Sequence, residues 1–257
     1  MNIRPKPSLD VLVIDDSAVV RQALTLILTR EPRVIVTVAA DPLIAMEKMR
    51  RHTPDVIILD LDLPRMDGLT FLERLMAEHP VPVVVCSGLA GPNTAMALRA
   101  LELGAVTVIA KPEQAVGPFL HNQAKDLITT VRNAAEVRVR RRSSGPSLRP
   151  VPEPIAHTSD PFLVVPGPPD TVLHPVGIGA SMGGVEAVTK VLSALPEGAP
   201  PILVVQHMPA GFTAAFARRL AELCRIDVAE ARHGDAVVPG RALIAPGDRH
   251  LTLSREG

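Results

Sequence analysis

The 257-residue sequence predicts two doubly wound parallel α/β units that are joined by a proline-rich linker. Short apolar runs alternate with segments of helical spacing over residues 8–121, and this alternation resumes after residue 171. Apolar runs without polar alternation are typical of parallel strands that helices cover on both faces. Eight prolines between Gly145 and Asp170 predict a semi-extended connector. The sequence therefore predicts units at residues 8–121 and 171–257, with a linker at 122–170.

The composition excludes several classes of protein. Hydrophobic residues make up 47% of the chain, the formal net charge is zero, and there is no tryptophan or tyrosine for stacking on nucleic-acid bases. Two cysteines are too few for a disulfide framework. No apolar run is long enough to span a membrane, and residues 1–8 lack the apolar core of a secretory signal. We expect a cytoplasmic protein without nucleic-acid partners or direct membrane insertion.

Five strands and four helices are predicted in the first unit. The predicted strands are 9–16, 34–39, 56–60, 82–87 and 107–110, and the predicted helices are 17–28, 42–51, 68–79 and 93–103. Parallel sheets of this kind bind their ligands beyond the carboxyl ends of the strands. The functional residues of this unit should therefore stand where the apolar runs end.

Polar residues follow the apolar runs at those ends. Asp15 and Asp16 end the first run, Asp60 ends the third, and Ser87 and Lys111 end the fourth and fifth. Clustered carboxylates repel one another, and a divalent cation such as Mg²⁺, which prefers oxygen ligands, would relieve that repulsion. A nearby lysine and hydroxyl would suit a phosphoryl group. The pattern predicts a magnesium and phosphoryl site.

This arrangement resembles the receiver domain of two-component response regulators over residues 9–121, which implies a flavodoxin-like (βα)5 fold. By this resemblance Asp60 accepts a phosphoryl group, and Ser87 and Lys111 contact the phosphoryl oxygens. The implied Mg²⁺ ligands are the side chains of Asp15, Asp16 and Asp60 with the main-chain carbonyl of Asp62. The segment from Leu63 to Gly68 matches the turn that follows the phosphoacceptor in that family. At the position three residues before Lys111, where the family usually carries an aromatic switch residue, this chain has Val108.

The linker begins with a segment that can continue as a helix. Residues 122–139 place Leu127, Ile128, Val131 and Ala135 on one side. A basic run follows at Arg138 and residues 140–142. We interpret it as part of a solvated connector, because no folded basic face that could bind nucleic acid accompanies it.

The second unit opens with a candidate nucleophile turn. An apolar run from Val176 leads into the pattern G-x-S-x-G at residues 179–183, and a helix is predicted over 185–195. A strand, a tight turn and a helix in this order hold Ser181 at the carboxyl end of a strand. The free N–H groups at the start of the helix could stabilise a developing oxyanion. A glycine-rich phosphate cradle or a plain turn fits the same pattern.

A candidate general base follows the next predicted strand. Residues 201–205 form an apolar run that ends before His207, so His207 should lie at the same sheet edge as Ser181. A helix at 211–224 places Phe212, Phe216, Leu220 and Leu223 toward the core. A strand at 226–229 and a hairpin with arms at 240–247 and 250–254 complete the predicted elements of this unit.

Three segments of the second unit together resemble one family, the CheB chemotaxis methylesterases: Gly177–Gly184, Gln206–Pro209 and Ala245–His250. The resemblance implies hydrolysis of glutamyl methyl esters and deamidation of glutamines on chemoreceptors, without a cofactor for the esterase. Ser181 would be the nucleophile and His207 the base, with backbone N–H groups of Met182 and Gly183 at the oxyanion. A chemotaxis histidine kinase would be the phosphoryl donor, and phosphorylation would relieve a block of the active site by the receiver. A complete protein is expected to be a monomer.

The chain departs from that family at two points. Met182 stands where the family usually has threonine. The family's catalytic aspartate lies in a glycine-rich motif further downstream than Gly257, and neither Asp235 nor Asp248 matches that motif. Loss of this aspartate in a serine protease lowers kcat about 10⁴-fold. The expectation is thus the first half of the second domain, with impaired activity.

Two alternative functions follow from the sequence. A catalytically impaired chain would act only as a phosphoreceiver and binding module. An ordinary α/β-hydrolase would place its acid between the serine and a late histidine. Here the segment between Ser181 and His207 is short and contains only Glu186 and Glu197 as acids, which disfavours the hydrolase.

Overall fold

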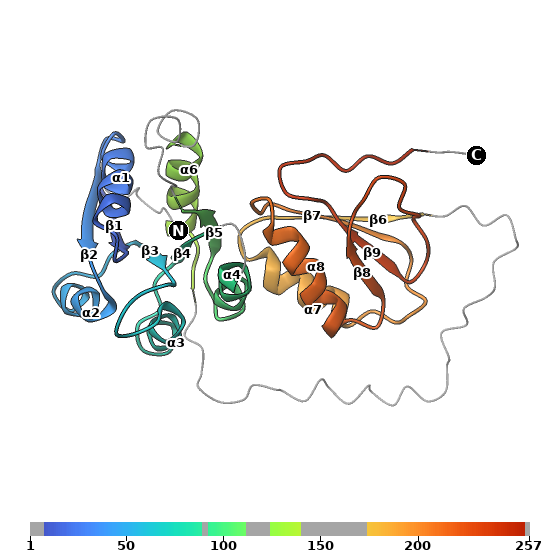
Figure 1. Ribbon diagram of the computed structural model, residues 1–257, viewed down its shortest axis with the longest axis horizontal. Helices are drawn as coiled ribbons and strands as arrows, with labels where there is room; N and C mark the ends of the chain where they lie inside the picture. Colours follow the sequence, from blue (N-terminus) through green and yellow to red (C-terminus); the bar gives the residue numbers. More distant parts are fainter. Residues whose placement is uncertain (1–7, 89–91, 112–123, 140–173, 255–257) are drawn as a thin grey trace, which may run out of the picture.

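The computed structural model describes residues 8–88, 92–111, 124–139 and 174–254 and contains two α/β units (Figure 1). The first unit is built on a sheet of order β2-β1-β3-β4-β5, and the second on a sheet of order β6-β7-β9-β8. Every strand pair in both sheets is parallel. The predicted fold class, two parallel α/β units, is confirmed.

The strands of the first sheet end at a common edge. Their bounds are Leu9–Ile14 for β1, Val34–Ala39 for β2, Val56–Asp60 for β3, Val83–Ser87 for β4 and Thr107–Ala110 for β5. Asp60 pairs with Cys86, and Ser87 pairs with Ala110. All residues of β3 and β4 are buried, which explains why these runs carry no polar alternation.

Helices cover both faces of this sheet. They are α1 (Ala18–Leu28), α2 (Pro42–Arg51), α3 (Gly68–Glu78), α4 (Pro92–Glu102) and α6 (Ala124–Ala135). Alternate residues of each strand point to opposite faces. Leu12 and Ile14 of β1 belong to the core under α2, α3 and α4, whereas Val11 and Val13 belong to the core under α1 and α6.

Helix α6 lies within the range that the sequence assigns to the linker. Its residues Leu127 and Val131 are buried, and the helix packs beside α1 on the first sheet. The described part of the predicted linker is therefore largely helical and belongs to the packed first unit. The remainder, including Arg140–Arg142 and the proline-rich segment, lies outside the described residues.

The second unit has two helices on one face of its sheet. The strands are β6 (Val176–Ala180), β7 (Ile202–Gln206), β8 (Asp227–Glu230) and β9 (Arg241–Ile244), and the helices are α7 (Gly184–Ser193) and α8 (Phe212–Leu223). Phe212, Phe216 and Leu220 are buried as predicted, but Leu223 is 42% exposed at the end of α8. In β7, Ile202 and Val204 face the helices, whereas Val205 is 51% exposed.

The hairpin predicted near the end of the chain is wrong. Strand β9 lies between β7 and β8 and is parallel to both. Ala242, Leu243 and Ile244 are all buried, so this strand is apolar on both faces and suits the interior of a parallel sheet. Residues 251–254 form no strand, and Leu253 is 56% exposed.

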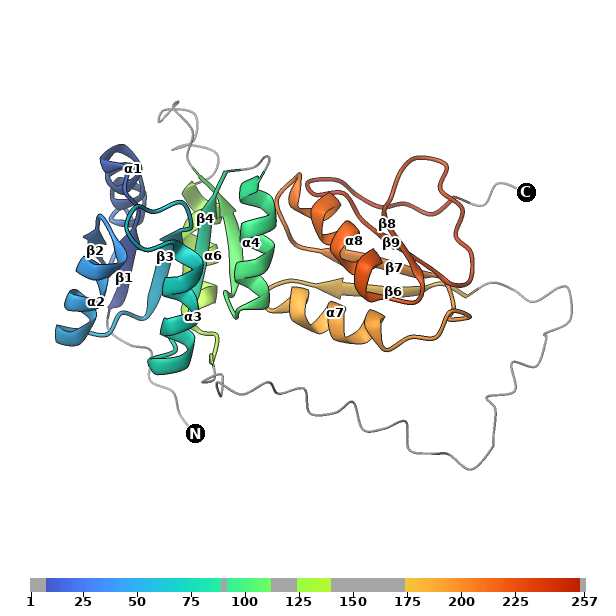
Figure 2. The ribbon, with the colours of Figure 1, turned by 60° about the horizontal axis from the view of Figure 1, so that its bottom comes forward.

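The two units meet along α4. This helix lies against α7 and α8 (Figure 2). Apolar side chains of both units form one continuous core cluster that includes Leu98, Leu101 and Val185. At the rim of this contact, Nε of Arg219 on α8 is 2.9 Å from Oε1 of Glu102 on α4. The interface therefore combines an apolar centre with a charged rim.

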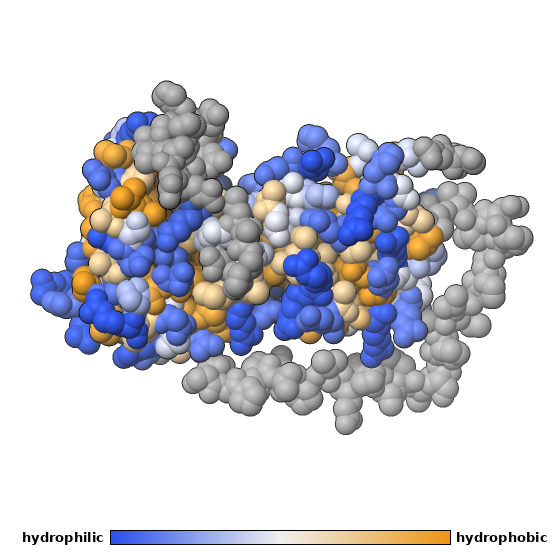
Figure 3. Space-filling view, viewed as in Figure 1, coloured by the Kyte–Doolittle hydropathy of each residue, from blue (hydrophilic) through white to orange (hydrophobic). Residues whose placement is uncertain are grey.

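The opposite end of the first unit is an open sheet edge. Apolar side chains gather there near β2 and α1 (Figure 3), where Val19, Leu26 and Ile35 are exposed.

None of the helices in the described ranges combines the length and the apolar character that a membrane crossing requires.

We expect Gly68→Ala to destabilise the first unit by about 1–3 kcal/mol. A Cβ at this position would lie 2.6 Å from the Asp60 carbonyl oxygen and 2.6 Å from Leu61 Cα, both of which are backbone atoms. The exposed Gly198 has no atom within 4 Å of an added Cβ, so Gly198→Ala should change stability by no more than about 0.5 kcal/mol. The midpoints of urea unfolding measure both effects, and equal midpoints for the two variants would contradict the expected crowding.

Candidate functional site

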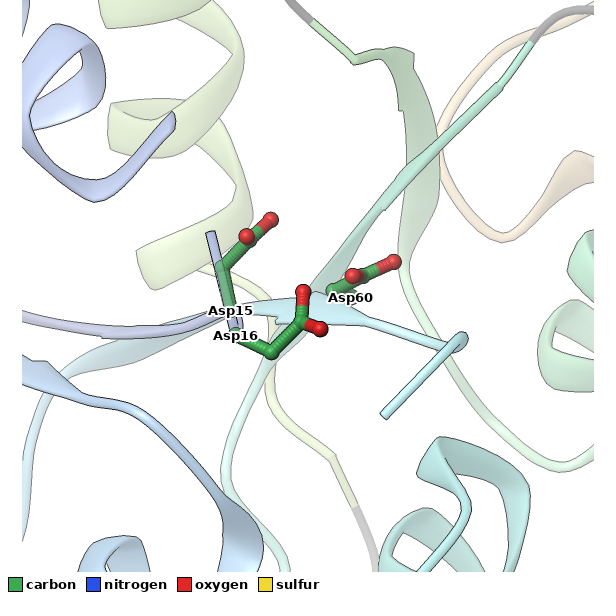
Figure 4. A group of neighbouring side chains, drawn as sticks. All are labelled: Asp15, Asp16 and Asp60. Atoms are coloured by element: carbon green, nitrogen blue, oxygen red, sulfur yellow. The ribbon is translucent and has the colours of Figure 1, made fainter. Parts of the chain in front are cut away.

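Three carboxyl groups converge at the carboxyl ends of β1 and β3. One oxygen from each of Asp15, Asp16 and Asp60 lies within 4.8 Å of the others (Figure 4). Asp15 is 1% and Asp60 3% exposed, whereas Asp16 is exposed to solvent. The parallel register brings these acids together, as the strand ends predicted.

Lys111 reaches this acidic cluster from the end of β5. Its Nζ is 2.6 Å from Asp60 Oδ2 and 3.2 Å from Asp15 Oδ2. Burial alone would lower the pKa of Lys111, but the hydrogen bond to Asp60 and the charges of Asp60 and Asp15 outweigh burial and raise it to about 12. The Lys111 backbone N–H donates to the Ser87 carbonyl at 2.8 Å, so the buried Ser87 lies beside the same edge.

The electrostatics of the acidic cluster suit a divalent cation. Burial, and then the charge of Asp60, raise the pKa of Asp15, and burial is also the largest cause of the raised pKa of Asp60. Lys111 supplies one positive charge to this cluster, 3.2 Å from Asp15 Oδ2, against the three carboxyl groups of Asp15, Asp16 and Asp60. An oxygen-ligand cation such as Mg²⁺ would compensate the remaining carboxylate repulsion.

The loop after β3 is held by a contact that the sequence reasoning missed. Arg65, with a backbone φ of 71°, forms an ion pair with the buried carboxyl of Asp41. The other oxygen of Asp41 accepts hydrogen bonds from the N–H groups of Leu43 and Ile44 at the start of α2. Within the loop, the Asp62 N–H donates to Asp60 Oδ1 at 3.2 Å. These contacts position the segment that follows Asp60, and no feature of the sequence pairs Arg65 with Asp41.

Ser181 and His207 meet at the carboxyl ends of β6 and β7. These strands are parallel neighbours, and Ala180 lies opposite Gln206. The His207 backbone N–H donates to the Ala180 carbonyl at 2.9 Å, and Ser181 Oγ is 3.5 Å from His207 Nδ1. The structure thus places side by side the two residues that the sequence predicts as nucleophile and base.

The turn after Ser181 directs backbone donors toward the first unit. Gly183, with a φ of 71°, precedes α7, and its N–H donates to the Val106 carbonyl at 3.3 Å. Met182 is half-buried and packs, like Val137 and Val139, against the core cluster of the first unit under α1 and α6. The Val106 carbonyl of the first unit therefore accepts a hydrogen bond from the Gly183 N–H, which the sequence predicts as a donor to an oxyanion.

Gln206 is a second residue that the sequence reasoning did not single out as functional. Its side chain is 6% exposed at the end of β7, and its Nε2 donates to the Ser181 carbonyl at 2.8 Å and to the His207 carbonyl at 3.3 Å. The sequence feature that could have indicated Gln206 is its position, because it is a polar residue that ends an apolar run and directly precedes His207.

A cavity of about 380 Å³ lies between the two units. Ser181, Gln206 and His207 line it from the second unit. Val108 and Arg138 line it from the first unit. Val108, which stands where receivers usually carry an aromatic residue, therefore lies at the same cavity as Ser181.

The described residues give His207 no carboxylate partner. Asp235 accepts a hydrogen bond from the Arg232 N–H at 2.7 Å and lies 3.4 Å from Arg241, so it is engaged within its own part of the chain.

The fold and these two sites define a class, a receiver-type α/β domain coupled to a hydrolase-like α/β domain. The family models that match the chain are the response regulator receiver domain at residues 11–116 and the CheB methylesterase at residues 176–256. A solved structure, the response regulator domain of CheB from Thermotoga maritima, is 34% identical, with a TM-score of 0.46, over 51% of this chain and 98% of that chain.

Full-length relatives agree with these matches. The protein-glutamate methylesterase/protein-glutamine glutaminase 1 of Anaeromyxobacter dehalogenans is 54% identical over 96% of this chain and 70% of its own length. The corresponding enzyme 2 of Xanthomonas euvesicatoria is 48% identical over 96% of this chain and 71% of its own length. The chain belongs to the CheB methylesterase family, with a response regulator receiver domain preceding the methylesterase domain.

We expect Asp15→Asn to stabilise the metal-free protein at pH 7. The raised pKa of Asp15 means that the folded state favours its protonated form. In the wild type, the stability that protonated Asp15 contributes is fully present below the unfolded pKa of 3.8. It is lost as the pH rises through the folded pKa. At pH 7 the buried carboxylate therefore opposes folding, and the gain in melting temperature should shrink toward pH 4.

Asp16→Asn is the matched control. Both variants should reduce the rise in melting temperature that added Mg²⁺ produces in the wild type, because each removes one negative charge from the cation site. Only Asp15→Asn should raise the melting temperature without metal, because Asp16 is exposed. An unchanged Mg²⁺ response in both variants would exclude the acidic cluster as the cation site.

Proposed function

We propose that the chain is a phosphorylation-regulated methylesterase that hydrolyses glutamate methyl esters and deamidates glutamines on chemoreceptors. The observation that carries this proposal is the pairing of Ser181 Oγ with His207 Nδ1 at 3.5 Å beside a cavity between the two units. The names of the relatives, protein-glutamate methylesterase/protein-glutamine glutaminase, support the same substrates.

In the proposed reaction, Ser181 Oγ attacks the carbonyl carbon of the ester while His207 accepts the serine proton. The oxyanion that forms would receive hydrogen bonds from the backbone N–H groups of Met182 and Gly183. His207 then returns the proton to the leaving oxygen, and methanol departs. Water, deprotonated by His207, attacks the acyl-serine and releases glutamate and free Ser181. With glutamine as substrate, the leaving group is ammonia.

The distance between nucleophile and base is compatible with this role. A productive proton transfer needs about 2.6–3.2 Å between the heavy atoms, and such hydrogen bonds are often longer before substrate binds. A shift of less than 1 Å would close the 3.5 Å gap between Ser181 and His207. No metal or organic cofactor is required for these steps.

For the receiver, we propose Asp60 as the phosphoacceptor and a chemotaxis histidine kinase as the donor. Asp15, Asp16 and Asp60, with the Asp62 carbonyl, would hold Mg²⁺, which would neutralise charge on the phosphoryl group. Lys111, which lies 2.6 Å from Asp60, and Ser87 would contact the phosphoryl oxygens.

The contact between the units supports autoinhibition. The Gly183 N–H donates a hydrogen bond to the Val106 carbonyl, and α4 packs against α7 and α8. A phosphoryl group at Asp60 would alter the adjoining ends of β4 and β5, and residues 106–108 of β5 and its preceding loop line the cavity. Opening of this contact would release the Gly183 N–H for the oxyanion.

The proposed domain boundaries are 8–121 for the receiver, 122–170 for the linker and 171–257 for the methylesterase part, with helix α6 of the linker range packed on the receiver sheet. We further propose a cytoplasmic, monomeric protein that binds chemoreceptors without entering the membrane and has no nucleic-acid partner. The zero net charge supports the last point.

Ser181→Ala should abolish methanol release from methylated chemoreceptor membranes, with a loss of at least about 10³-fold, because the attacking oxygen is removed. Ser193→Ala is the matched control, since Ser193 is exposed at the end of α7 and should leave the rate unchanged. If the wild type and Ser181→Ala released methanol at equal rates, the assignment of Ser181 as the nucleophile would be refuted. Absence of release by wild type, with intact phosphorylation of Asp60, would favour the receiver-only alternative.

Arg219→Ala should raise the rate of the unphosphorylated protein by a factor of about 1.4 to 5, because an exposed ion pair contributes about 0.2–1 kcal/mol to the closed arrangement. The neighbouring Arg218→Ala provides the control, since Arg218 is exposed and the Glu102 pair is made by Arg219. Identical basal rates for the two variants would show that this ion pair does not hold the units together.

A further inference from the structure

Gln206 is a buried polar residue at the end of an otherwise apolar strand. The sequence of β7 is Ile-Leu-Val-Val-Gln, and the Gln206 side chain is 94% buried between the Ser181 turn and the start of α7. A buried amide without hydrogen bonds costs several kcal/mol, so its partners determine whether it can occupy this position. Those partners are the carbonyl groups of Ser181 and His207.

One amide group connects both candidate catalytic residues. Nε2 of Gln206 donates to the Ser181 carbonyl at 2.8 Å and to the His207 carbonyl at 3.3 Å. The Ser181 carbonyl also accepts the N–H of Gly184 at 2.8 Å, which closes the turn. The two segments are also joined by the hydrogen bond from the His207 N–H to the Ala180 carbonyl, and Ser181 Oγ lies 3.5 Å from His207 Nδ1.

The surroundings allow the amide one orientation. A rotation of the amide by 180° would direct Oε1 at two carbonyl oxygens, which repel it. Oε1 instead lies against the start of α7, where a Cβ added to Gly184 would be 2.1 Å away. It has no hydrogen-bond partner among the described residues. The two N–H donors therefore fix the side chain, and Gly184 provides the space for it.

We infer that Gln206 is a positioning residue that sets the separation of Ser181 and His207 for proton transfer. This inference rests on the proposed nucleophile and base. Gln206 contacts the backbone of both residues and acts through them. Because a misplacement of about 1 Å can reduce a rate about 10²-fold, loss of this bridge should lower reactivity even if the fold persists.

The test is the rate at which a fluorophosphonate labels Ser181, followed by intact mass and peptide mapping. Gln206→Met keeps the length of the side chain but removes both donors. Its maximal labelling rate should fall about 10- to 100-fold, while the concentration for half-maximal rate stays unchanged. Gln22→Met makes the same chemical change at an exposed position of α1 and should label like wild type. Phosphorylation of Asp60 reports an intact first unit in each variant.

Gln206→Glu supplies a second, pH-dependent test. The introduced carboxylate has the shape of glutamine but repels both carbonyls, whereas its protonated form can donate one hydrogen bond. The ratio of its labelling rate to that of Gln206→Met should therefore rise as the pH falls. If Gln206 only filled the core, Gln206→Met, which preserves the side-chain length, would label at the wild-type rate at every pH.

The outcomes separate the inference from the function on which it rests. If wild type and Gln206→Met label Ser181 at equal maximal rates, the positioning role is refuted while the nucleophile stands. If wild type is not labelled at Ser181, the nucleophile assignment fails and the role of Gln206 fails with it. A reduced maximal rate in Gln206→Met, with partial recovery in Gln206→Glu at low pH, supports the inference.

Discussion

Parallel pairing of fully apolar strands is the constraint on which both sites depend. Because every strand pair in the two sheets is parallel, residues that follow the strands collect at one edge of each sheet. Asp15 and Asp60 come together at the edge of the first sheet, and Ser181 and His207 at the edge of the second. In the described part of the chain, helices cover both faces of the first sheet and one face of the second, and the polar groups gather where the strands end.

The contact between the units links these edges through the backbone of β5. Lys111 at the end of this strand touches the acidic cluster, and Val106, just before the strand, accepts the Gly183 N–H. The charged pair of Glu102 and Arg219 lies at the rim. The four residues of β5 thus lie between the acidic cluster and the residue that contacts the Ser181 turn, so one short strand connects the two candidate sites.

Much of this architecture could be predicted because it depends on local patterns. The apolar runs located the strands, and the residues that follow them located Asp15, Asp60, Ser181 and His207. The order of strands in the second sheet could not be predicted, since β9 inserts between β7 and β8 and the hairpin expectation failed. Periodicity also did not show that α6 packs on the first sheet, because an amphipathic face does not identify its partner.

The amino-acid sequence by itself determined the fold class, the strand ends and the chemical types of the site residues, because these follow from short-range patterning. Only the tertiary structure decided that Arg65 pairs with Asp41, that the Val106 carbonyl accepts a hydrogen bond from the Gly183 N–H, and that Gln206 bridges Ser181 and His207. These contacts join residues far apart in the chain or depend on side-chain direction. Their geometry is set by the packing of whole elements, which no local pattern specifies.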